Sequence, residues 1–102
     1  MALDLKLATI VVTGGRGFLG KHVCEALVAA GAVEDQLHPI GKADFDLCDK
    51  TQVEELYLAF KPDVLIHLAA VVGGIGANQE NPGRYLYENL VMATELIEAG
   101  RR

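Results

Sequence analysis

The sequence contains no serine, and this absence excludes every mechanism that relies on a serine nucleophile. The two cysteines, Cys24 and Cys48, form neither a metal-binding spacing nor a disulfide framework, so both are predicted to be ordinary buried thiols. No apolar run approaches the roughly 18 residues of a membrane span. The first nine residues lack the basic region and the long apolar region of a signal peptide. These absences predict a soluble chain in the reducing cytoplasm.

Charge of one sign is not concentrated anywhere in the chain. The net charge of -5 is spread without a block of like charges, which argues against nucleic acid or an anionic membrane as a partner. The carboxylates of Asp44, Asp46 and Asp49 lack the spacing and the further ligands of a calcium loop, so no metal site is expected. Hydrophobic residues make up 51% of the chain but aromatic residues only 6%, which suits a parallel sheet buried between helices.

Three short aliphatic runs predict strands at residues 9–13, 36–41 and 64–69. After each of them, apolar residues recur at helical spacing. Strands that alternate with helices pair in parallel through right-handed crossovers. The order βαβαβα predicts an α/β fold, the N-terminal half of a Rossmann-type doubly wound parallel sheet with strand order 3-2-1. Because a complete fold of this kind needs more than 102 residues, residues 1–102 are expected to be a partial domain.

Local signals predict the ends and the buried faces of these elements. Pro39, inside the second strand, indicates an edge strand or a short element. Thr51, with Glu54 three residues later, predicts a capping box at the start of the second helix, and Pro62 predicts its end. The last helix is expected at about residues 84–99. Helical spacing places Leu86, Leu90, Ala93 and Ile97 on one apolar face of it.

The segment between the first strand and the first helix is rich in glycine. It reads Thr13-Gly14-Gly15-Arg16-Gly17-Phe18-Leu19-Gly20, which gives the spacing G-x-x-G-x-x-G. Gly14 permits a tight turn, Gly17 lets the backbone approach a pyrophosphate, and Gly20 lets the helix pack close to the sheet. The helix N-terminus adds free N–H groups and a partial positive charge for the anion. With a strand before it and a helix after it, the loop predicts a dinucleotide site, the alternative being a plain tight turn.

The end of the second strand bears on the choice of cofactor. Lys42 is basic, and Arg16 projects from the phosphate loop, so together they favour the additional 2′-phosphate of NADP. Asp44 is an acidic residue at about the distance at which one would bind the ribose 2′-hydroxyl of NAD. The sequence therefore favours NADP and leaves NAD open, and Lys42 can also be a solvated surface lysine.

These motifs resemble those of the extended short-chain dehydrogenases/reductases, the nucleotide-sugar epimerases and dehydratases. The glycine loop is similar to their T-G-x-x-G-x-x-G motif, residues 44–49 to their segment after the second strand, and residues 61–70 to their third strand and turn. Val72-Gly73-Gly74-Ile75, followed by Asn78 and Asn81-Pro82, resembles more narrowly the GDP-L-fucose synthases. Those enzymes epimerise and then reduce a GDP-4-keto-6-deoxymannose with NADPH. The resemblance runs from about Ile10 to the end of the chain.

The resemblance implies roles for individual residues. Beside the cofactor pyrophosphate it places Gly14, Gly17, Phe18, Leu19 and Gly20, and beside the 2′-phosphate it places Arg16. It implies that Asp46 and Leu47 border the adenine, that Ala69, Ala70 and Val72 lie along the nicotinamide, and that Gly74, Ile75 and Asn78 face the sugar nucleotide. Asn89 matches a family asparagine with a structural role.

The catalytic groups of this family are not among the expected site residues. Its active-site Ser or Thr and its Tyr-x-x-x-Lys pair follow later strands, before which this chain stops. Tyr57 and Lys61 have the right spacing, but they fall on the second helix, where Tyr57 is predicted to be a core residue. His67 is predicted to be a core or strand-end histidine. The chain alone is therefore expected to have no catalytic residue and no turnover.

Three hypotheses about function remain open. The chain can be the NADP-binding N-terminal segment of a GDP-L-fucose synthase-like epimerase/reductase, whose full-length relatives bind a GDP-sugar. It can be a non-catalytic module that binds NADP or another nucleotide. It can also be a half-domain that functions by pairing with a second copy or a partner chain, through an unpaired edge of the strand at residues 9–13. The reading frame beyond Arg102 and a titration with NADPH and NADH would discriminate among them.

Overall fold

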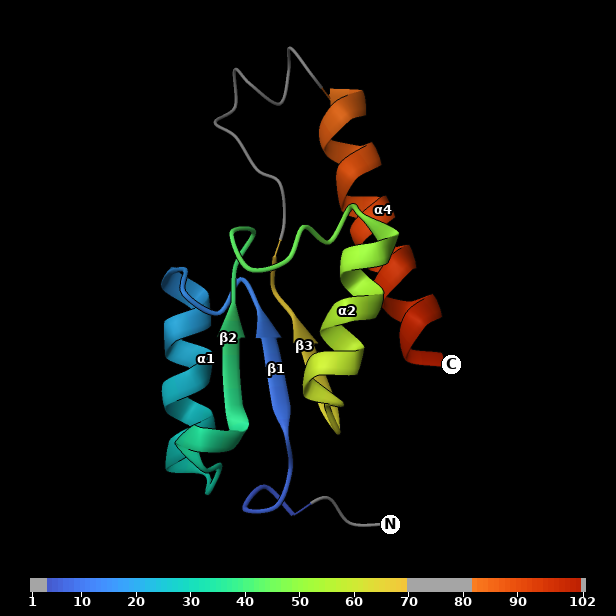
Figure 1. Cartoon of the computed structure of the whole chain (residues 1–102). Coiled ribbons are helices and arrows are strands. Elements are labelled where there is room, and N and C mark those ends of the chain that lie inside the picture. The colour runs from blue at the N-terminus through green and yellow to red at the C-terminus, as the bar shows by residue number, and fades with distance from the viewer. Residues whose placement is uncertain (1–3, 70–81, 102) are drawn as a thin grey trace.

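A computed structural model describes residues 4–69 and 82–101 (Figure 1). In chain order the elements are β1 (Ile10–Thr13), α1 (Phe18–Ala29), the 3-10 helix η1 (Glu34–Gln36), β2 (Leu37–Ile40), α2 (Lys50–Phe60), β3 (Val64–His67) and α4 (Pro82–Arg101). The predicted α/β fold is confirmed, and each predicted strand and helix is found close to its expected bounds. Within the described residues, no helix is both long enough and apolar enough to cross a bilayer.

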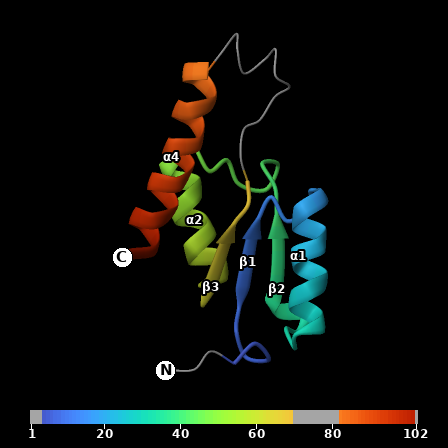
Figure 2. The ribbon, with the colours of Figure 1, turned by 180° about the vertical axis from the view of Figure 1, so that it is seen from behind.

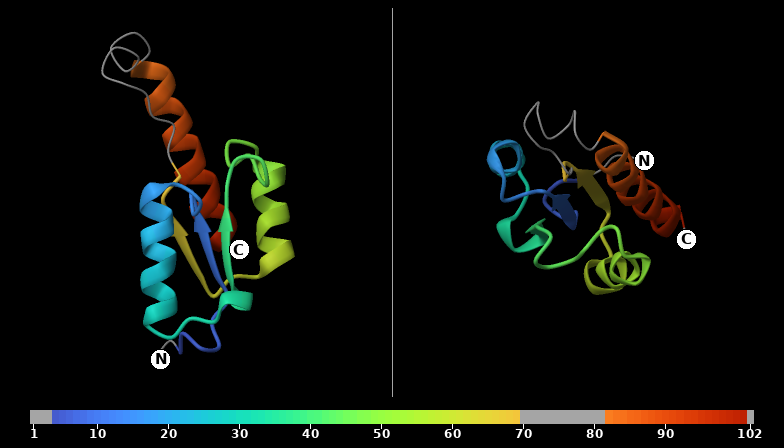
Figure 3. Two further views of the ribbon diagram at one scale, coloured as in Figure 1. Left: turned by 90° about the vertical axis from the view of Figure 1, so that its left-hand side faces the viewer. Right: turned by 90° about the horizontal axis from the view of Figure 1, so that it is seen from above.

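The sheet has β1 in its middle. β1 pairs in parallel with β2 on one side and with β3 on the other, which gives the order β2-β1-β3. The predicted order 3-2-1 is thus corrected, because the third strand pairs with the first strand and not with the second. The chain moves outward from β1 to β2 and then returns past β1, so right-handed crossovers place α1 and α2 on opposite faces of the sheet (Figure 3). This arrangement remains that of a doubly wound sheet.

Alternate residues of β1 contribute to the cores on the two faces of the sheet. Ile10 and Val12 pack in the cluster that contains Ala8, Ala32 and Leu37, against Cys24 and Leu27 of the α1 face. Val11 belongs to the opposite cluster, which is formed with Ile40, Leu47, Val53, Leu56, Met92 and Leu96. Both faces of β1 are therefore buried, and this explains why its sequence is an uninterrupted apolar run.

Helix α4 packs beside α2 on one face of the sheet (Figure 1). The residues that it buries there are Met92 and Leu96. Leu90 and Ile97, which belong to the apolar face expected from helical spacing, are instead 57% and 73% exposed. The helix carries two apolar stripes at helical spacing, and spacing alone does not tell which stripe meets the sheet.

Helix α2 begins and ends at residues with defined backbone roles. Its N-cap is Asp49, whose Oδ1 accepts a hydrogen bond of 2.9 Å from the N–H of Thr51. The predicted capping box at Thr51 is therefore wrong, because Thr51 is already the second residue of the helix. The helix ends at Phe60, as expected from Pro62, and its C-cap Lys61 adopts a left-handed conformation (φ 46°) directly before that proline.

Candidate functional site

The carboxyl ends of β1 and β3 meet at the point where the chain leaves the sheet in two directions. β1 leads to α1 on one face, whereas the helix that follows β3 in sequence, α4, lies on the other face (Figures 1 and 2). Adjacent parallel strands with connections to opposite faces form a topological switch point. Open α/β sheets bind their ligands in the crevice outside such a point.

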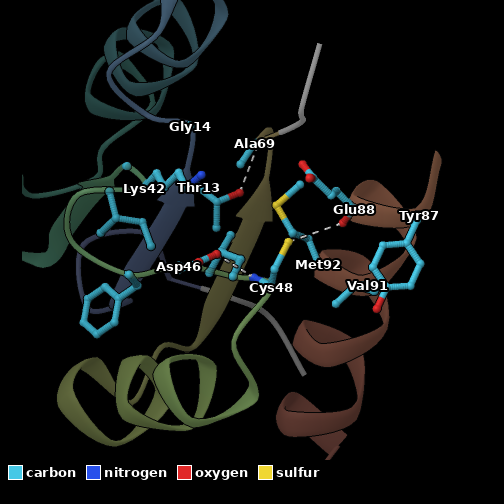
Figure 4. A pocket seen from close by; sticks show the side chains of 14 residues that line it. Thr13, Gly14, Lys42, Asp46, Cys48, Ala69, Tyr87, Glu88, Val91 and Met92 are labelled. Carbon is cyan, nitrogen blue, oxygen red and sulfur yellow. Dashed lines mark hydrogen bonds between the residues drawn. The ribbon is translucent and has the colours of Figure 1, made fainter. Parts of the chain in front are cut away.

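A cavity of about 320 Å³ lies at this switch point (Figure 4). Helix α4 supplies one side of it, the ends of β1 and β3 supply its floor, and the segment after β2 supplies the other side. The lining residues are Thr13, Gly14, Ile40, Gly41, Lys42, Phe45, Asp46, Leu47, Cys48, Ala69, Tyr87, Glu88, Val91 and Met92. The lining is mostly apolar, with a few polar groups at its edge, which is typical of a small-molecule site.

Two glycines of the loop after β1 are required by the packing around them. Gly14 has a left-handed φ of 67°, and a Cβ there would lie 2.9 Å from the backbone N of Ala69. A Cβ on Gly20 would lie 2.2 Å from the carbonyl oxygen of Gly14, which is closer than real atoms approach. The loop from β1 to α1 can therefore make its tight turn, packed against the residues after β3, only with glycine at both positions.

The N-terminus of α1 is open to an anion. Its N-cap is Gly17, and this helix, which lies wholly within the described residues, has no side-chain cap and no acidic residue in its first turn. The side chains of Phe18 and Leu19 are exposed but carry no hydrogen-bond donor, so only their backbone N–H groups could bond to a phosphate. Free N–H groups and the helix dipole favour negative charge here.

The segment after β2 is held by its own side chains. Asp46 Oδ1 accepts a hydrogen bond of 3.0 Å from the N–H of Cys48, and the N–H of Asp46 donates to Gln52 Oε1 at 2.7 Å. The Cys48 thiol donates to the carbonyl of Glu88 at 3.7 Å, which links this segment to α4 (Figure 4). Burial raises the pKa of the Cys48 thiol, and the carboxylates of Asp46 and Glu88 raise it further. The raised pKa keeps the thiol protonated near neutral pH, so it lines the cavity as a neutral group.

Arg16 and Lys42, the two cations expected at the 2′-phosphate, occupy different places. Lys42 lines the main cavity. Among the described residues, Arg16 instead lines a smaller hollow of about 220 Å³ beside β2, together with Asp44. The guanidinium of Arg16 forms an ion pair with the carboxylate of Asp44. The glycine loop is thus joined to the segment after β2.

The structure brings together part of the set that the sequence predicted. Gly14, Lys42, Asp46, Leu47 and Ala69 line the main cavity. Gly17, Phe18, Leu19 and Gly20 form the start of α1 next to it, and Arg16 lies in the neighbouring hollow. Outside the described residues are Ala70, Val72, Gly74, Ile75 and Asn78.

Several lining residues were missed from the sequence. The wall from α4 is formed by Tyr87, Glu88, Val91 and Met92. Their helical spacing places these residues on one face of α4. The sequence offers a second apolar face, which contains Leu90 and Ile97, and does not tell which of the two faces borders the cavity. Gly15 was also missed, although a Cβ there would lie 2.6 Å from the Pro39 side chain. It lets the loop pack against β2.

Tyr57 has a structural place between α2 and α4. The Tyr57 hydroxyl donates a hydrogen bond of 2.8 Å to the carbonyl of Leu96, and its ring packs against the core between α2 and α4. Burial raises the pKa of Tyr57, which is opposite to the change that a catalytic tyrosine needs near neutral pH. Across residues 4–69 and 82–101, no group of three potential ligands could hold a metal ion.

Comparison with known proteins places this architecture in a family. The chain is 32% identical over 93 residues to GDP-L-fucose synthase of Azorhizobium caulinodans, a match that covers 91% of the chain and 29% of that protein. The fold matches GDP-mannoheptose C4 reductase of Campylobacter jejuni, solved with NADP bound, at a TM-score of 0.83 and 22% identity, over 96% of the chain and 28% of the reductase. It matches UDP-glucose 4-epimerase of Thermus thermophilus, solved with NAD, at a TM-score of 0.73 and 29% identity, over 90% of the chain and 33% of the epimerase.

The matches cover most of this chain but only part of each relative. The chain spans about 29% of the length of the curated relatives to which it is similar. In contrast, the sequence profile of the NAD dependent epimerase/dehydratase family matches residues 10–102, which is nearly the whole chain. The chain therefore belongs to the NAD dependent epimerase/dehydratase family.

Proposed function

We propose that the chain is the NADP-binding N-terminal segment of a GDP-L-fucose synthase-like nucleotide-sugar epimerase/reductase. The observation that carries this proposal is the position of the cavity. It lies at the switch point between β1 and β3, and the carbonyl of its lining residue Gly14 accepts a hydrogen bond of 3.1 Å from the N–H of Gly17, the N-cap of α1. A dinucleotide needs both features side by side, because its pyrophosphate requires the helix N-terminus while its bases require an apolar crevice.

The residues around the cavity fit such a cofactor. In this proposal the backbone from Gly14 to Gly20 holds the pyrophosphate, Asp46 and Leu47 border the adenine, and Ala69 lies on the nicotinamide side. A Cβ on Gly17 would meet Gly14 O at 3.4 Å as its nearest described neighbour, so the outer side of the loop has room for a phosphate. Ala70 and Val72 extend the cofactor site, and Gly74, Ile75 and Asn78 contact a GDP-sugar. The bound cofactor would supply the hydride.

The preference for NADP over NAD rests on this chain's own cations. Arg16 in the phosphate loop and Lys42 after β2 are the groups that a 2′-phosphate would contact. The matched structures do not decide the question, since the reductase was solved with NADP and the epimerase with NAD. Measured affinities for the two cofactors are therefore needed.

Turnover of a sugar nucleotide is proposed for the whole protein and not for these residues. The sequence has no serine, and the Tyr57 hydroxyl is occupied by the Leu96 carbonyl. In this proposal the described residues bind and orient the cofactor, and the acid and the base of turnover belong to the rest of the whole protein. A cytoplasmic location remains a prediction from the sequence.

Direct titration with NADPH and NADH tests the proposal. The chain has no tryptophan, so the nicotinamide fluorescence of the cofactor is the cleaner signal, with calorimetry as a second method. We expect saturable binding that is tighter for NADPH. Gly17→Ala should weaken NADPH at least about tenfold, because its methyl group would intrude on the charge-assisted bonds from the loop.

Gly83→Ala is the matched control for this substitution. A Cβ there has no described atom within 4 Å, and Gly83 lies at the start of α4. Binding should be unchanged in this variant. Absence of saturable binding of either cofactor at millimolar concentration would overturn both the enzyme-segment proposal and the alternative of a non-catalytic nucleotide-binding module.

A second candidate is a half-domain that functions by association with another chain. Leu90 and Ile97 expose an apolar stripe on α4, and among the described strands none pairs with the outer edge of β3. The edge proposed from the sequence, residues 9–13, is excluded because β1 is paired on both sides. Sedimentation should show association that Leu90→Lys weakens and that Leu58→Lys, at another exposed leucine on α2, does not. A wild-type monomer at all concentrations would count against this candidate.

A further inference from the structure

Arg16 and Asp44 connect two segments that are distant in sequence. Arg16 belongs to the glycine loop between β1 and α1, and Asp44 belongs to the turn after β2. Their side chains form an ion pair and remain 56% and 38% exposed. A ligand arriving from solvent can therefore reach both partners.

The carboxylate of Asp44 is fixed by its own turn. Asp44 Oδ2 accepts a hydrogen bond of 2.9 Å from the N–H of Gly41, and the N–H of Asp44 donates back to the Gly41 carbonyl at 3.0 Å. The oxygen that contacts Arg16 is this same Oδ2. These two bonds fix the Asp44 carboxylate independently of Arg16. The long Arg16 side chain is the member of the pair that can change its conformation.

Arg16 passes over the end of β2 to reach this carboxylate. A Cβ on Gly41 would lie 4.0 Å from Arg16 Cζ, so the guanidinium lies above Gly41. The hollow around the pair, of about 220 Å³, is lined further by His38, Phe45 and Phe60. In doubly wound sheets, an acid after the second strand binds a ribose 2′-hydroxyl, whereas an arginine at this place accommodates a 2′-phosphate. This chain carries both groups and pairs them with each other.

We infer that Asp44 is a specificity-determining residue that acts through Arg16. In the free protein Asp44 holds the guanidinium, so a 2′-phosphate must compete with a carboxylate for it. A 2′-hydroxyl needs no such exchange, because it can donate a hydrogen bond directly to the Asp44 carboxylate. The pair therefore reduces the preference for NADP that Arg16 alone would give. This inference rests on the proposed function, because it assigns the determinant of cofactor choice within the same site.

Asp44→Asn removes the charge and keeps the turn. Asparagine retains a side-chain oxygen that can accept the hydrogen bond from the Gly41 N–H. Release of an exposed ion pair together with one repulsive charge should raise the affinity for NADPH about tenfold, with no rise for NADH. Asp35→Asn is the matched control, because Asp35 is an exposed acid in η1 at the opposite end of β2. It removes the same charge and should leave both affinities unchanged.

A double-mutant cycle shows whether Asp44 acts through Arg16. NADPH and NADH are titrated at one salt concentration against the wild type, Asp44→Asn, Arg16→Gln and the double variant, with circular dichroism as a check on folding. We expect the gain from Asp44→Asn to shrink to about twofold when Arg16 is absent. An equal gain in both backgrounds, or an unchanged ratio of NADPH to NADH affinity in Asp44→Asn, would overturn the inference alone. Failure of the wild type to bind either cofactor would overturn the proposed function and the inference with it.

Discussion

The hydroxyl oxygen of Thr13 lies 2.6 Å from Nδ1 of His67, at paired positions of β1 and β3. The same oxygen accepts hydrogen bonds from the N–H groups of Leu68 at 3.0 Å and Ala69 at 3.1 Å. Its own proton is therefore directed at Nδ1, which makes His67 an acceptor there and places its ring proton on Nε2. One buried hydroxyl thus fixes the turn after β3 against the glycine loop, where the cavity begins.

Thr13→Val tests how much this hydroxyl contributes to stability. Valine has nearly the same shape, but it takes the hydroxyl partner away from the Ala69 N–H and from Nδ1, while the Leu68 N–H keeps its bond of 3.1 Å to the Thr13 carbonyl. The free energy of unfolding should fall by about 2–3 kcal/mol. Thr13→Ser keeps the hydroxyl and removes one methyl group, so it should cost only about 1 kcal/mol. Urea unfolding followed by far-UV circular dichroism measures both. If the valine variant is at least as stable as the serine variant, the hydrogen bonds do not hold this turn.

His67 makes stability depend on pH. Burial lowers the pKa of His67 from its ordinary value of 6.5, so at intermediate pH the unfolded chain binds more protons than the folded one. The contribution of His67 is complete above about pH 6.5 and is lost as the pH falls through the lowered value in the folded state. Urea unfolding at a series of pH values from 8 to 5 should show this loss. In His67→Asn, where Oδ1 can replace Nδ1 as the acceptor, the slope should decrease. An unchanged slope would assign the pH dependence to other groups.

The sequence alone predicts those features that depend on local spacing. The uninterrupted apolar run of β1, the glycine loop and the following helix all read correctly, because burial on both faces and a tight turn each leave a local pattern. The strand order was predicted wrongly, because nothing in the sequence of Val64–His67 tells which strand it pairs with. That order depends on the faces that the two crossing helices cover, which is a property of the whole fold.

Side-chain pairings between segments that are distant in sequence could not be predicted from the sequence either. Arg16 and Asp44 were both recognised as relevant to cofactor choice, but their ion pair depends on how the loop after β1 lies over the end of β2. In α4, Leu90 and Met92 belong to two apolar stripes, and only packing against α2 selects the one that is buried. Glu88 was missed as a lining residue for the same reason, because the packing of α4 decides which of its faces borders the cavity.

Gly20→Ala should disrupt the junction of the glycine loop and α1. Its methyl carbon would lie 2.2 Å from Gly14 O and 2.6 Å from Gly15 Cα, both of which are backbone atoms that cannot move aside independently. We expect a loss of about 3 kcal/mol in the free energy of unfolding. Gly17→Ala, three residues earlier, meets Gly14 O at an ordinary 3.4 Å and should cost less than about 1 kcal/mol. Equal stability of the two variants in urea unfolding would show that α1 does not need this close approach.

Tyr57→Phe separates a structural tyrosine from a catalytic one. The substitution keeps the ring between α2 and α4 but removes the hydroxyl that donates to the Leu96 carbonyl. Loss of one such bond should cost about 1 kcal/mol of unfolding free energy. The affinity for NADPH should not change, because Tyr57 is not among the described residues that line the cavity.

Tyr87→Phe provides the contrast, since Tyr87 lines the cavity and is largely exposed. This variant should leave stability nearly unchanged, and any effect that it has should fall on cofactor binding. Thermal unfolding and the cofactor titration are measured on both variants in one buffer. If Tyr57→Phe weakens NADPH binding while its stability stays that of the wild type, Tyr57 acts at the site, and its spacing from Lys61 then has a functional meaning.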